Sequence, residues 1–332
     1  MKLRFTCFFY IFFFMILNAQ PTELIGKWIL VRTLNNNNTR LDINNSDYSK
    51  KMIYQIDKNS FKINGQLFKP KFKENIINLS DKNYPEFTYT IKENYLITKE
   101  IKGHTTNYFL KIDDFIKRFP EFSLKEIDYN DRKVYLDNGI SAYDFNHDLT
   151  YDFFILLNGN SNSDKRNIIN PDSLPLQFEY ILTVDNKIKD FKIINSENNL
   201  ADNDYIERFK KASKYFKNTT DKDVLLRYTG VSITSYPELT NKDEKRLFEI
   251  SAQIDRYYYK NEFINIIDLY DEFTKLKIKP NRFNKFKDDN YIRLGVSFLA
   301  QNRIDEACIS FKNVGDITDF RVRNYLLDFC QK

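Results

Sequence analysis

The stretch Asp288–Val314, DDNYIRLGVSFLAQNRIDEACISFKNV, decides how the C-terminal third of the chain folds. Small and apolar residues recur at helical steps of three and four on both sides of a turn at Gln301–Arg303. They are Leu294, Gly295 and Phe298 before the turn, and Ala307, Phe311 and Val314 after it. Gly295 and Ala307 would let two antiparallel helices approach closely, with the aromatic rings filling the space around them. The stretch therefore predicts a close-packed helical hairpin.

A weaker copy of the pattern precedes this hairpin. In that copy Ile254 and Ile266 stand where Gly295 and Ala307 stand, so its helices would be held further apart. The two pairs together resemble tetratricopeptide repeats, whose stacked arrays bind peptides on a concave surface. The resemblance implies a helical domain over residues 241–332. With so few repeats, it would serve either as a structural cap or scaffold, or as a surface for a protein partner.

Length and composition favour a protein of several folded domains. The 332 residues are 42% hydrophobic and 16% aromatic, with only 8 Gly and 8 Pro, so two or three domains can each bury a core. The net charge is +5, and acidic and basic residues are interspersed along the chain. This pattern indicates a solvated surface and argues against nucleic-acid binding.

The N-terminus predicts export from the cell. Lys2 and Arg4 precede an apolar run at Phe5–Leu17, and Asn18–Gln20 supply the polar end at which a signal peptidase could cut. The apolar run is shorter than the ~20 residues of a membrane-spanning helix. We therefore interpret residues 1–20 as a cleaved signal peptide, with an uncleaved anchor as the alternative. The mature protein would be periplasmic or extracellular and would have no stable membrane span.

Two cysteines remain after cleavage, Cys308 and Cys330. An oxidising compartment allows such a pair to form a disulfide. Cys308 lies on the second helix of the predicted hairpin, and Cys330 follows a further helical run, so an antiparallel return could join them. Two separately buried thiols are the alternative.

Residues 21–115 predict an antiparallel β-meander. Short alternating stretches are separated by turn residues such as Asn64–Gly65 and Glu93–Asn94. The stretches are 51–56, 60–63, 87–91, 95–101 and 105–112. A meander of this kind avoids bare edges by curling into a barrel. In the strand that begins at Tyr95, we expect Tyr95, Ile97 and Lys99 to share one face.

Gly26–Lys27–Trp28, at the start of the mature chain, resembles the Gly-x-Trp motif of the lipocalin-like family. The resemblance implies a small barrel closed at one end by Trp28, with a mouth that could hold a small apolar ligand. The meander is shorter than that of a ligand-binding lipocalin. The alternative is a barrel whose lumen is filled by its own aromatic side chains.

Residues 117–239 predict a second α+β module that contains a candidate calcium loop. Oxygen side chains occur at Asp144, Asn146, Asp148 and Asp152, a spacing that could wrap a hard cation. The resemblance is to short calcium loops of extracellular β-repeat proteins. Leu149, however, occupies the position that normally takes Gly for the sharp turn. A solvated turn rich in Asp and Asn is the alternative.

Residues 176–236 read as strand, strand, helix and strand, an order that resembles the C-terminal domain of TonB-type energy transducers. The Trp-x-Pro that follows the helix in that family is missing. The chain also lacks a Pro-rich spacer. We therefore expect a domain used for packing or peptide contact rather than for energy transduction.

No catalytic signature accompanies these modules. The sequence has no zinc-binding spacing, no Gly-rich phosphate loop and no nucleophile elbow. We therefore predict an α+β multidomain protein that is not an enzyme and acts as a protein-binding scaffold in a bacterial cell envelope, with contact through the C-terminal helices. One alternative is a lipocalin-like carrier of an apolar ligand. Another is a hydrolase with an unrecognised carboxylate site.

Overall fold

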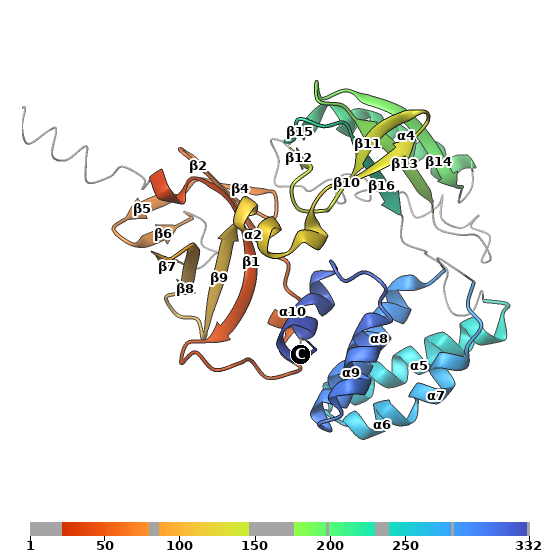
Figure 1. Cartoon of the computed structure of the whole chain (residues 1–332). Helices are drawn as coiled ribbons and strands as arrows, with labels where there is room; N and C mark the ends of the chain where they lie inside the picture. Colours follow the sequence, from red (N-terminus) through yellow and green to blue (C-terminus); the bar gives the residue numbers. More distant parts are fainter. Residues whose placement is uncertain are drawn as a thin grey trace, which may run out of the picture. The chain divides into compact units, whose positions relative to one another are not determined.

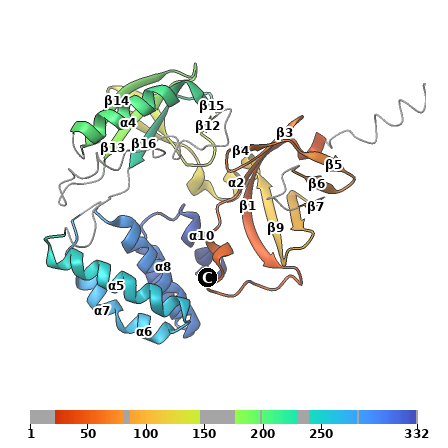
Figure 2. The same ribbon diagram turned by 180° about the vertical axis from the view of Figure 1, so that it is seen from behind.

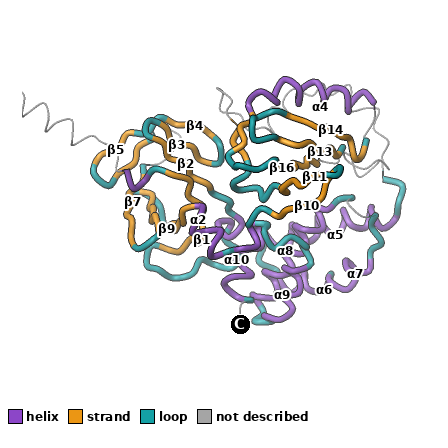
Figure 3. The backbone as a smooth tube through the Cα atoms, turned by 45° about the horizontal axis from the view of Figure 1, so that its top comes forward, coloured by secondary structure: helices purple, strands orange, loops and turns teal. Residues whose placement is uncertain are grey.

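The computed structural model describes residues 22–79, 86–145, 176–196, 199–229, 239–279 and 282–330. The predicted α+β class is confirmed: strands form the first part of the chain and helices gather in the last part (Figure 3). The chain divides into two compact units. The first holds the residues up to Asp42 and Lys50–Pro120, and the second holds Ile43–Ser49 and everything from Glu121 onward.

The first unit is one nine-stranded antiparallel sheet that curls into a half-barrel (Figure 1). Its strands are β1 (Gly26–Asn35), β2 (Ile53–Asp57), β3 (Ser60–Ile63), β4 (Gln66–Phe68), β5 (Lys71–Lys73), β6 (Ile76–Asn78), β7 (Phe87–Lys92), β8 (Tyr95–Glu100) and β9 (Thr105–Lys111). The spatial order is β4-β3-β2-β1-β9-β8-β7-β6-β5, so β1 pairs with both β2 and β9. The short helix α2 (Ile112–Arg118) follows β9.

The order of the strands explains why the sheet curls. The edge strand β4 ends at Phe68, and the opposite edge strand β5 begins at Lys71. Three residue steps span at most about 11 Å, so the two edges of the sheet must lie close together. The hairpin turns of the meander contain residues in the left-handed conformation. In one of them Asn64 (φ 49°) is followed by Gly65 (φ 87°), a conformation that Gly adopts without strain.

Aromatic side chains fill the interior of the curled sheet. Tyr54 is central: its ring centroid lies 4.3 Å from that of Phe109, 4.9 Å from Phe61 and 6.1 Å from Phe87. All four rings are buried, and burial raises the pKa of the Tyr54 hydroxyl far above its usual value. The half-barrel is therefore packed by its own side chains at this level.

The strand β8 confirms one expectation about faces and shows which face is buried. Tyr95, Ile97 and Lys99 do share a face, but that face is the less buried one. Phe87 pairs with Glu100, and this register turns Leu96 and Thr98 toward the core. A shift of one residue exchanges the two faces of a strand, and alternation alone does not fix the register.

The second unit begins with a smaller α+β module. Its elements are β10 (Lys125–Tyr129), β11 (Arg132–Leu136), β12 (Tyr143–Phe145), β13 (Gln177–Leu182), β14 (Ile188–Asn195), α4 (Asn199–Ala212), β15 (Phe216–Asn218) and β16 (Val224–Thr229). Five strands form a sheet in the order β10-β11-β16-β13-β14, in which β11 and β16 run parallel. The helix α4 lies along this sheet (Figure 2), and Phe209 packs on Phe178 and Tyr180. The predicted order of strand, strand, helix and strand is present as β13, β14, α4 and β16, with the short strand β15 inserted between α4 and β16.

Helices make up the rest of the described chain. They are α5 (Lys242–Tyr259), α6 (Phe263–Asp268), α7 (Tyr270–Lys275), α8 (Asn284–Ala300), α9 (Ile304–Lys312) and α10 (Phe320–Phe329). The Asn241 side chain caps α5 by accepting hydrogen bonds from the backbone N–H groups of Asp243 and Glu244. The hairpin predicted over Asp288–Val314 is the pair α8 and α9, with its turn at Asn302 (φ 58°).

Small residues and polar contacts hold the helices together in different places. Between α8 and α9, Gly295 lies directly against the ring of Phe311, with no room for a Cβ atom. Beside α5 the contacts are polar: Asn290 Nδ2 donates to Ser251 Oγ at 2.9 Å, and buried Arg282 pairs with buried Glu244 at 2.6 Å. Helix α5 is therefore fixed to α8 and to the residue Arg282 just before it by buried polar groups, which tolerate few alternative arrangements.

Candidate functional site

A segment from the middle of the first unit's sequence binds to the last helix. The connection from β1 to β2 contains Ile43–Ser49, which belongs to the second unit and includes a short 3-10 turn at Ser46–Ser49. The Tyr325 hydroxyl donates to the backbone carbonyl of Ile43 at 2.8 Å. Asn324 Nδ2 donates to the carbonyl of Tyr48 at 3.0 Å. Side chains of α10 thus contact the backbone of this segment at two points.

Aromatic stacking connects this recognition to the helical hairpin. The Tyr48 ring stacks on Tyr325 at a centroid distance of 4.6 Å and an interplanar angle of 18°. Tyr325 also stacks with Phe311, at a centroid distance of 4.8 Å and an interplanar angle of 9°. Phe311 in turn occupies the space that Gly295 leaves open. The small residue in α8 therefore determines where the stack on α10 can lie.

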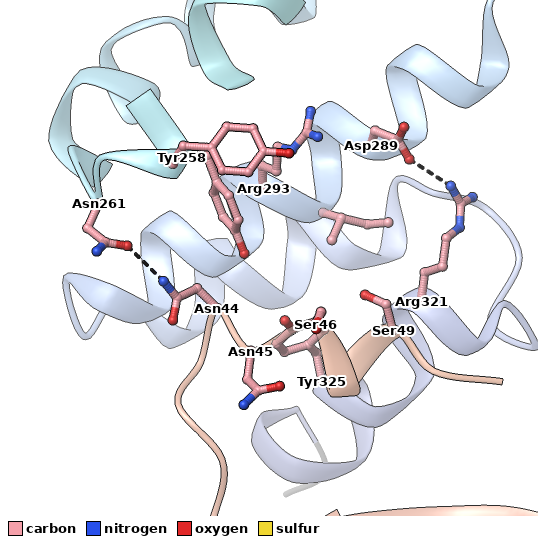
Figure 4. Close-up of a pocket in the computed structure, with 12 residues that line it drawn as sticks. Asn44, Asn45, Ser46, Ser49, Tyr258, Asn261, Asp289, Arg293, Arg321 and Tyr325 are labelled. Carbon is pink, nitrogen blue, oxygen red and sulfur yellow. Dashed lines mark hydrogen bonds and ion pairs between the residues drawn. The ribbon is translucent and has the colours of Figure 1, made fainter. Parts of the chain in front are cut away.

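A pocket of about 470 Å³ opens beside the bound segment (Figure 4). Helix α5 contributes Tyr258 and Tyr259 to the lining, α8 contributes Asp289 and Arg293, and α10 contributes Arg321. Asn44 and Asn261 close one end with a hydrogen bond of 2.7 Å between their side chains. This volume is in the range of small-ligand sites, which span roughly 300–1,000 Å³.

The pocket's Arg321 is surrounded by carboxylates. It donates to Asp319 at 2.6 Å and to Asp289 at 2.8 Å, and its third partner, Asp288, lies at 3.4 Å. The bond to Asp319 contributes most to raising the pKa of Arg321. Burial raises the pKa of Asp288 above its usual value, although Arg321 opposes the shift. The guanidinium hydrogens are thus largely engaged by protein carboxylates.

The second arginine of the pocket is also paired. Arg293 forms an ion pair with Asp255, and its guanidinium carbon lies 5.8 Å from the centroid of the Tyr258 ring. Burial raises the pKa of Tyr258 to about 12, although Arg293 opposes the shift. The Tyr258 hydroxyl is therefore neutral at physiological pH and can donate a hydrogen bond.

Trp28, predicted to close one end of the barrel, lies on β1 in the core of the first unit. It is 2% exposed, and its indole N–H donates to the carbonyl of Leu24 at 2.9 Å. The ammonium group of Lys111 lies 5.2 Å from the centroid of the ring. These contacts give Trp28 a packing role, with its single donor satisfied inside the chain.

Most of the candidate calcium loop lies outside the described residues. Asp144 is described and lies in β12, whereas Asn146, Asp148 and Asp152 are not. Among the described residues, no group of three or more His, Cys, Asp or Glu side chains is placed to hold a metal ion. The calcium loop therefore stays a prediction, which melting temperatures measured with millimolar Ca²⁺ and with a chelator would test.

The two cysteines that were predicted to pair are brought together. Cys308 on α9 and Cys330 at the end of α10 form a disulfide with an S–S distance of 2.03 Å. The bond ties the helical hairpin to the helix that binds Ile43–Ser49. The predicted signal peptide, residues 1–20, lies outside the described residues. In the part of the chain that the structure describes, no helix combines the length and apolar character needed to span a membrane.

The helices of this site are predicted by the sequence, whereas its polar residues are not. Arg321, Asp289 and Tyr258 come from three helices and show no shared motif in the sequence. The Ile43–Ser49 segment reads as an ordinary polar loop. The only local signal is Asp319, which caps α10 by accepting from the backbone N–H of Arg321.

The chain matches no known family model, and it has no significant match to a curated protein or a solved structure.

Proposed function

We propose that this protein is an exported, non-enzymatic component of a bacterial cell envelope whose C-terminal helices bind a protein partner. The positively charged and apolar start of the chain supports export. The disulfide between Cys308 and Cys330 fits an oxidising compartment. The site of binding is the pocket between α5, α8 and α10.

One observation carries this proposal: the helical surface already holds a stretch of polypeptide. Asn324 and Tyr325 donate to backbone carbonyls of Tyr48 and Ile43, and Tyr48 stacks on Tyr325. Backbone recognition combined with an aromatic anchor is a common way for a protein to bind a peptide. The pocket continues this surface past Asn44 and leaves room for side chains of a second polypeptide. The tetratricopeptide-like pattern of α8 and α9 supports the same function.

The lipocalin-like carrier is the weaker candidate. The Gly-x-Trp motif and the up-and-down order of the strands support a lipocalin-like interpretation of the first unit. However, the rings of Tyr54, Phe61 and Phe109 occupy its interior, and Trp28 makes its hydrogen bond within the chain. An apolar ligand would have to displace these packed rings.

Site-specific photo-crosslinking in the native host tests the proposal. A photoreactive residue would replace Tyr259, which lines the pocket and is 83% exposed, or, as a control, Ile309 on α9, which is 54% exposed. We expect a discrete crosslinked protein from position 259 and none from position 309. Equal crosslinking from both positions, or none from either, would contradict binding at the pocket.

A further inference from the structure

The charges around the pocket suggest what chemical group it accepts. Arg293 and Arg321 line it, and both are paired with carboxylates: Arg293 with Asp255, and Arg321 with Asp288, Asp289 and Asp319. Four carboxylates thus accompany two guanidinium groups, and the six groups together carry a charge of −2 when all are ionised. An anionic ligand would compete with carboxylates that are already in place.

The aromatic lining also favours a cationic ligand. Tyr258, Tyr259 and Tyr325 all contribute to the wall. Tyr325 stacks with Tyr48 and Phe311, and Tyr258 lies near Arg293, so the exposed ring of Tyr259 is the one whose face can attract a cation. The Tyr258 and Tyr325 hydroxyls are protonated at neutral pH, and burial raises their pKa further, so they add no negative charge. Their oxygens can accept a hydrogen bond from a basic group. Ile292 supplies an apolar surface, against which the alkyl part of a long basic side chain can lie.

Asp289 is placed to contact a cationic group in the pocket directly. It lines the pocket, and it uses one carboxylate oxygen to accept from Arg321 at 2.8 Å. A carboxylate has two oxygens and about four acceptor positions, so it can accept a second donor from the pocket side. Figure 4 shows Asp289 and Arg321 at one end of the pocket and Asn44 with Asn261 at the other.

We propose that the pocket binds the basic side chain of a partner protein, a lysine or an arginine, with Asp289 as its principal contact. This inference rests on the proposed function and names the chemistry of the partner at the same site. The bound segment Ile43–Ser49 forms one wall, through Asn44, Asn45, Ser46 and Ser49. The partner's basic residue would therefore lie beside this segment and would not need to displace it.

Saturation-transfer NMR with small probes tests this inference on the full mature chain with its disulfide intact. The probe is N-acetyl-lysine methylamide, and its neutral match is N-acetyl-norleucine methylamide, which has the same alkyl chain without the ammonium group. We expect saturation transfer to the side-chain methylenes of the lysine probe and not to those of the norleucine probe. Added salt should weaken the binding, because the pocket is open to solvent.

Two charge-neutral variants locate the contact. Asp289→Asn should weaken binding of the lysine probe about fivefold, as expected for an ion pair near a protein surface. Asp271→Asn is the matched control, because Asp271 is an exposed carboxylate on α7 that does not line the pocket. It should leave the affinity unchanged. Melting curves of both variants verify the fold, since Arg321 keeps Asp319 and Asp288 as partners in Asp289→Asn.

Three results would overturn the inference: equal binding of the two probes, no binding of either, or an affinity in Asp289→Asn within twofold of the natural chain. None of them bears on the crosslinking from position 259. A crosslinked partner without lysine binding would therefore leave the proposed function standing and reject only the basic side chain.

Discussion

Replacing Gly295 with alanine should destabilise the second unit, although alanine is the better helix former. A Cβ atom built at Gly295 would lie 2.4, 2.6 and 2.7 Å from three ring carbons of Phe311. Contacts between carbon atoms are favourable at about 3.5–4.0 Å, so the ring would have to move by roughly 1 Å. Phe311 is buried, and its face is stacked on Tyr325 at 4.8 Å, so a shift of the ring would disturb the stack.

The size of the effect follows from two opposing contributions. Overpacking a well-packed core costs about 1–3 kcal/mol, and replacing Gly by Ala inside a helix returns about 1 kcal/mol. We expect a net loss of about 1 kcal/mol in the free energy of unfolding, within a range of about 0–2 kcal/mol. In thermal unfolding followed by circular dichroism, this corresponds to a decrease of a few degrees in melting temperature.

A double-mutant cycle separates the clash from other causes. Phe311→Leu removes the ring that the added methyl group would meet, and it should be destabilising by itself because it leaves a cavity. In that background Gly295→Ala should cost nothing or should stabilise the helix, which gives a coupling energy of at least about 1 kcal/mol. If Gly295→Ala raised the melting temperature of the otherwise natural chain, the argument that Gly295 is required by Phe311 would be refuted.

Three further perturbations probe the same unit. Tyr325→Phe keeps the stacked ring and loses only the hydrogen bond to the carbonyl of Ile43, so chemical denaturation should show a loss of about 1 kcal/mol; no loss would mean that α10 does not hold the segment through this bond. Cys308→Ser should cost about 3 kcal/mol, because the disulfide closes a loop with a sequence separation of 22 residues, and the natural chain in reductant should melt like the variant. Burial raises the pKa of Asp288, so its favourable contribution to stability is present below the pKa of the unfolded chain and is lost as the pH rises through the folded value. Asp288→Asn should therefore raise the melting temperature at about pH 7 and have little effect at about pH 3, and a lower melting temperature at neutral pH would contradict this sign.

Local patterns in the sequence predicted the elements of this protein well. The steps of three and four between Leu294, Gly295 and Phe298 predicted α8, and the turn at Gln301–Arg303 separates it from α9 as expected. The turn at Glu93–Asn94 joins the strands that were predicted on either side, and the turn at Asn64–Gly65 follows the predicted strand β3 but leads into β4, which was not predicted. These features depend on residues within one or two turns of each other, so a reading of the sequence alone can detect them.

The sequence alone did not predict which face of a strand is buried or how neighbouring strands are aligned. Alternation in β8 placed Tyr95, Ile97 and Lys99 together, but only the pairing of Phe87 with Glu100 showed that Leu96 points into the core. The sequence of β8 by itself does not specify how β8 aligns with β7. Register is an outcome of how both strands pack over the aromatic interior.

The candidate site itself was decided by tertiary structure. Tyr325 and Ile43 are 282 positions apart in the sequence, and Asn324 and Tyr48 are 276 apart. Contacts at such separations leave no periodic pattern, so the sequence could specify the helix α10 without indicating the segment that it binds. The sequence by itself determined the helices and strands, the small residue at Gly295 and the pair of cysteines. Only the fold brought a loop of the β-meander onto α10 and paired Arg293 and Arg321 with carboxylates, because those arrangements depend on packing between distant parts of the chain.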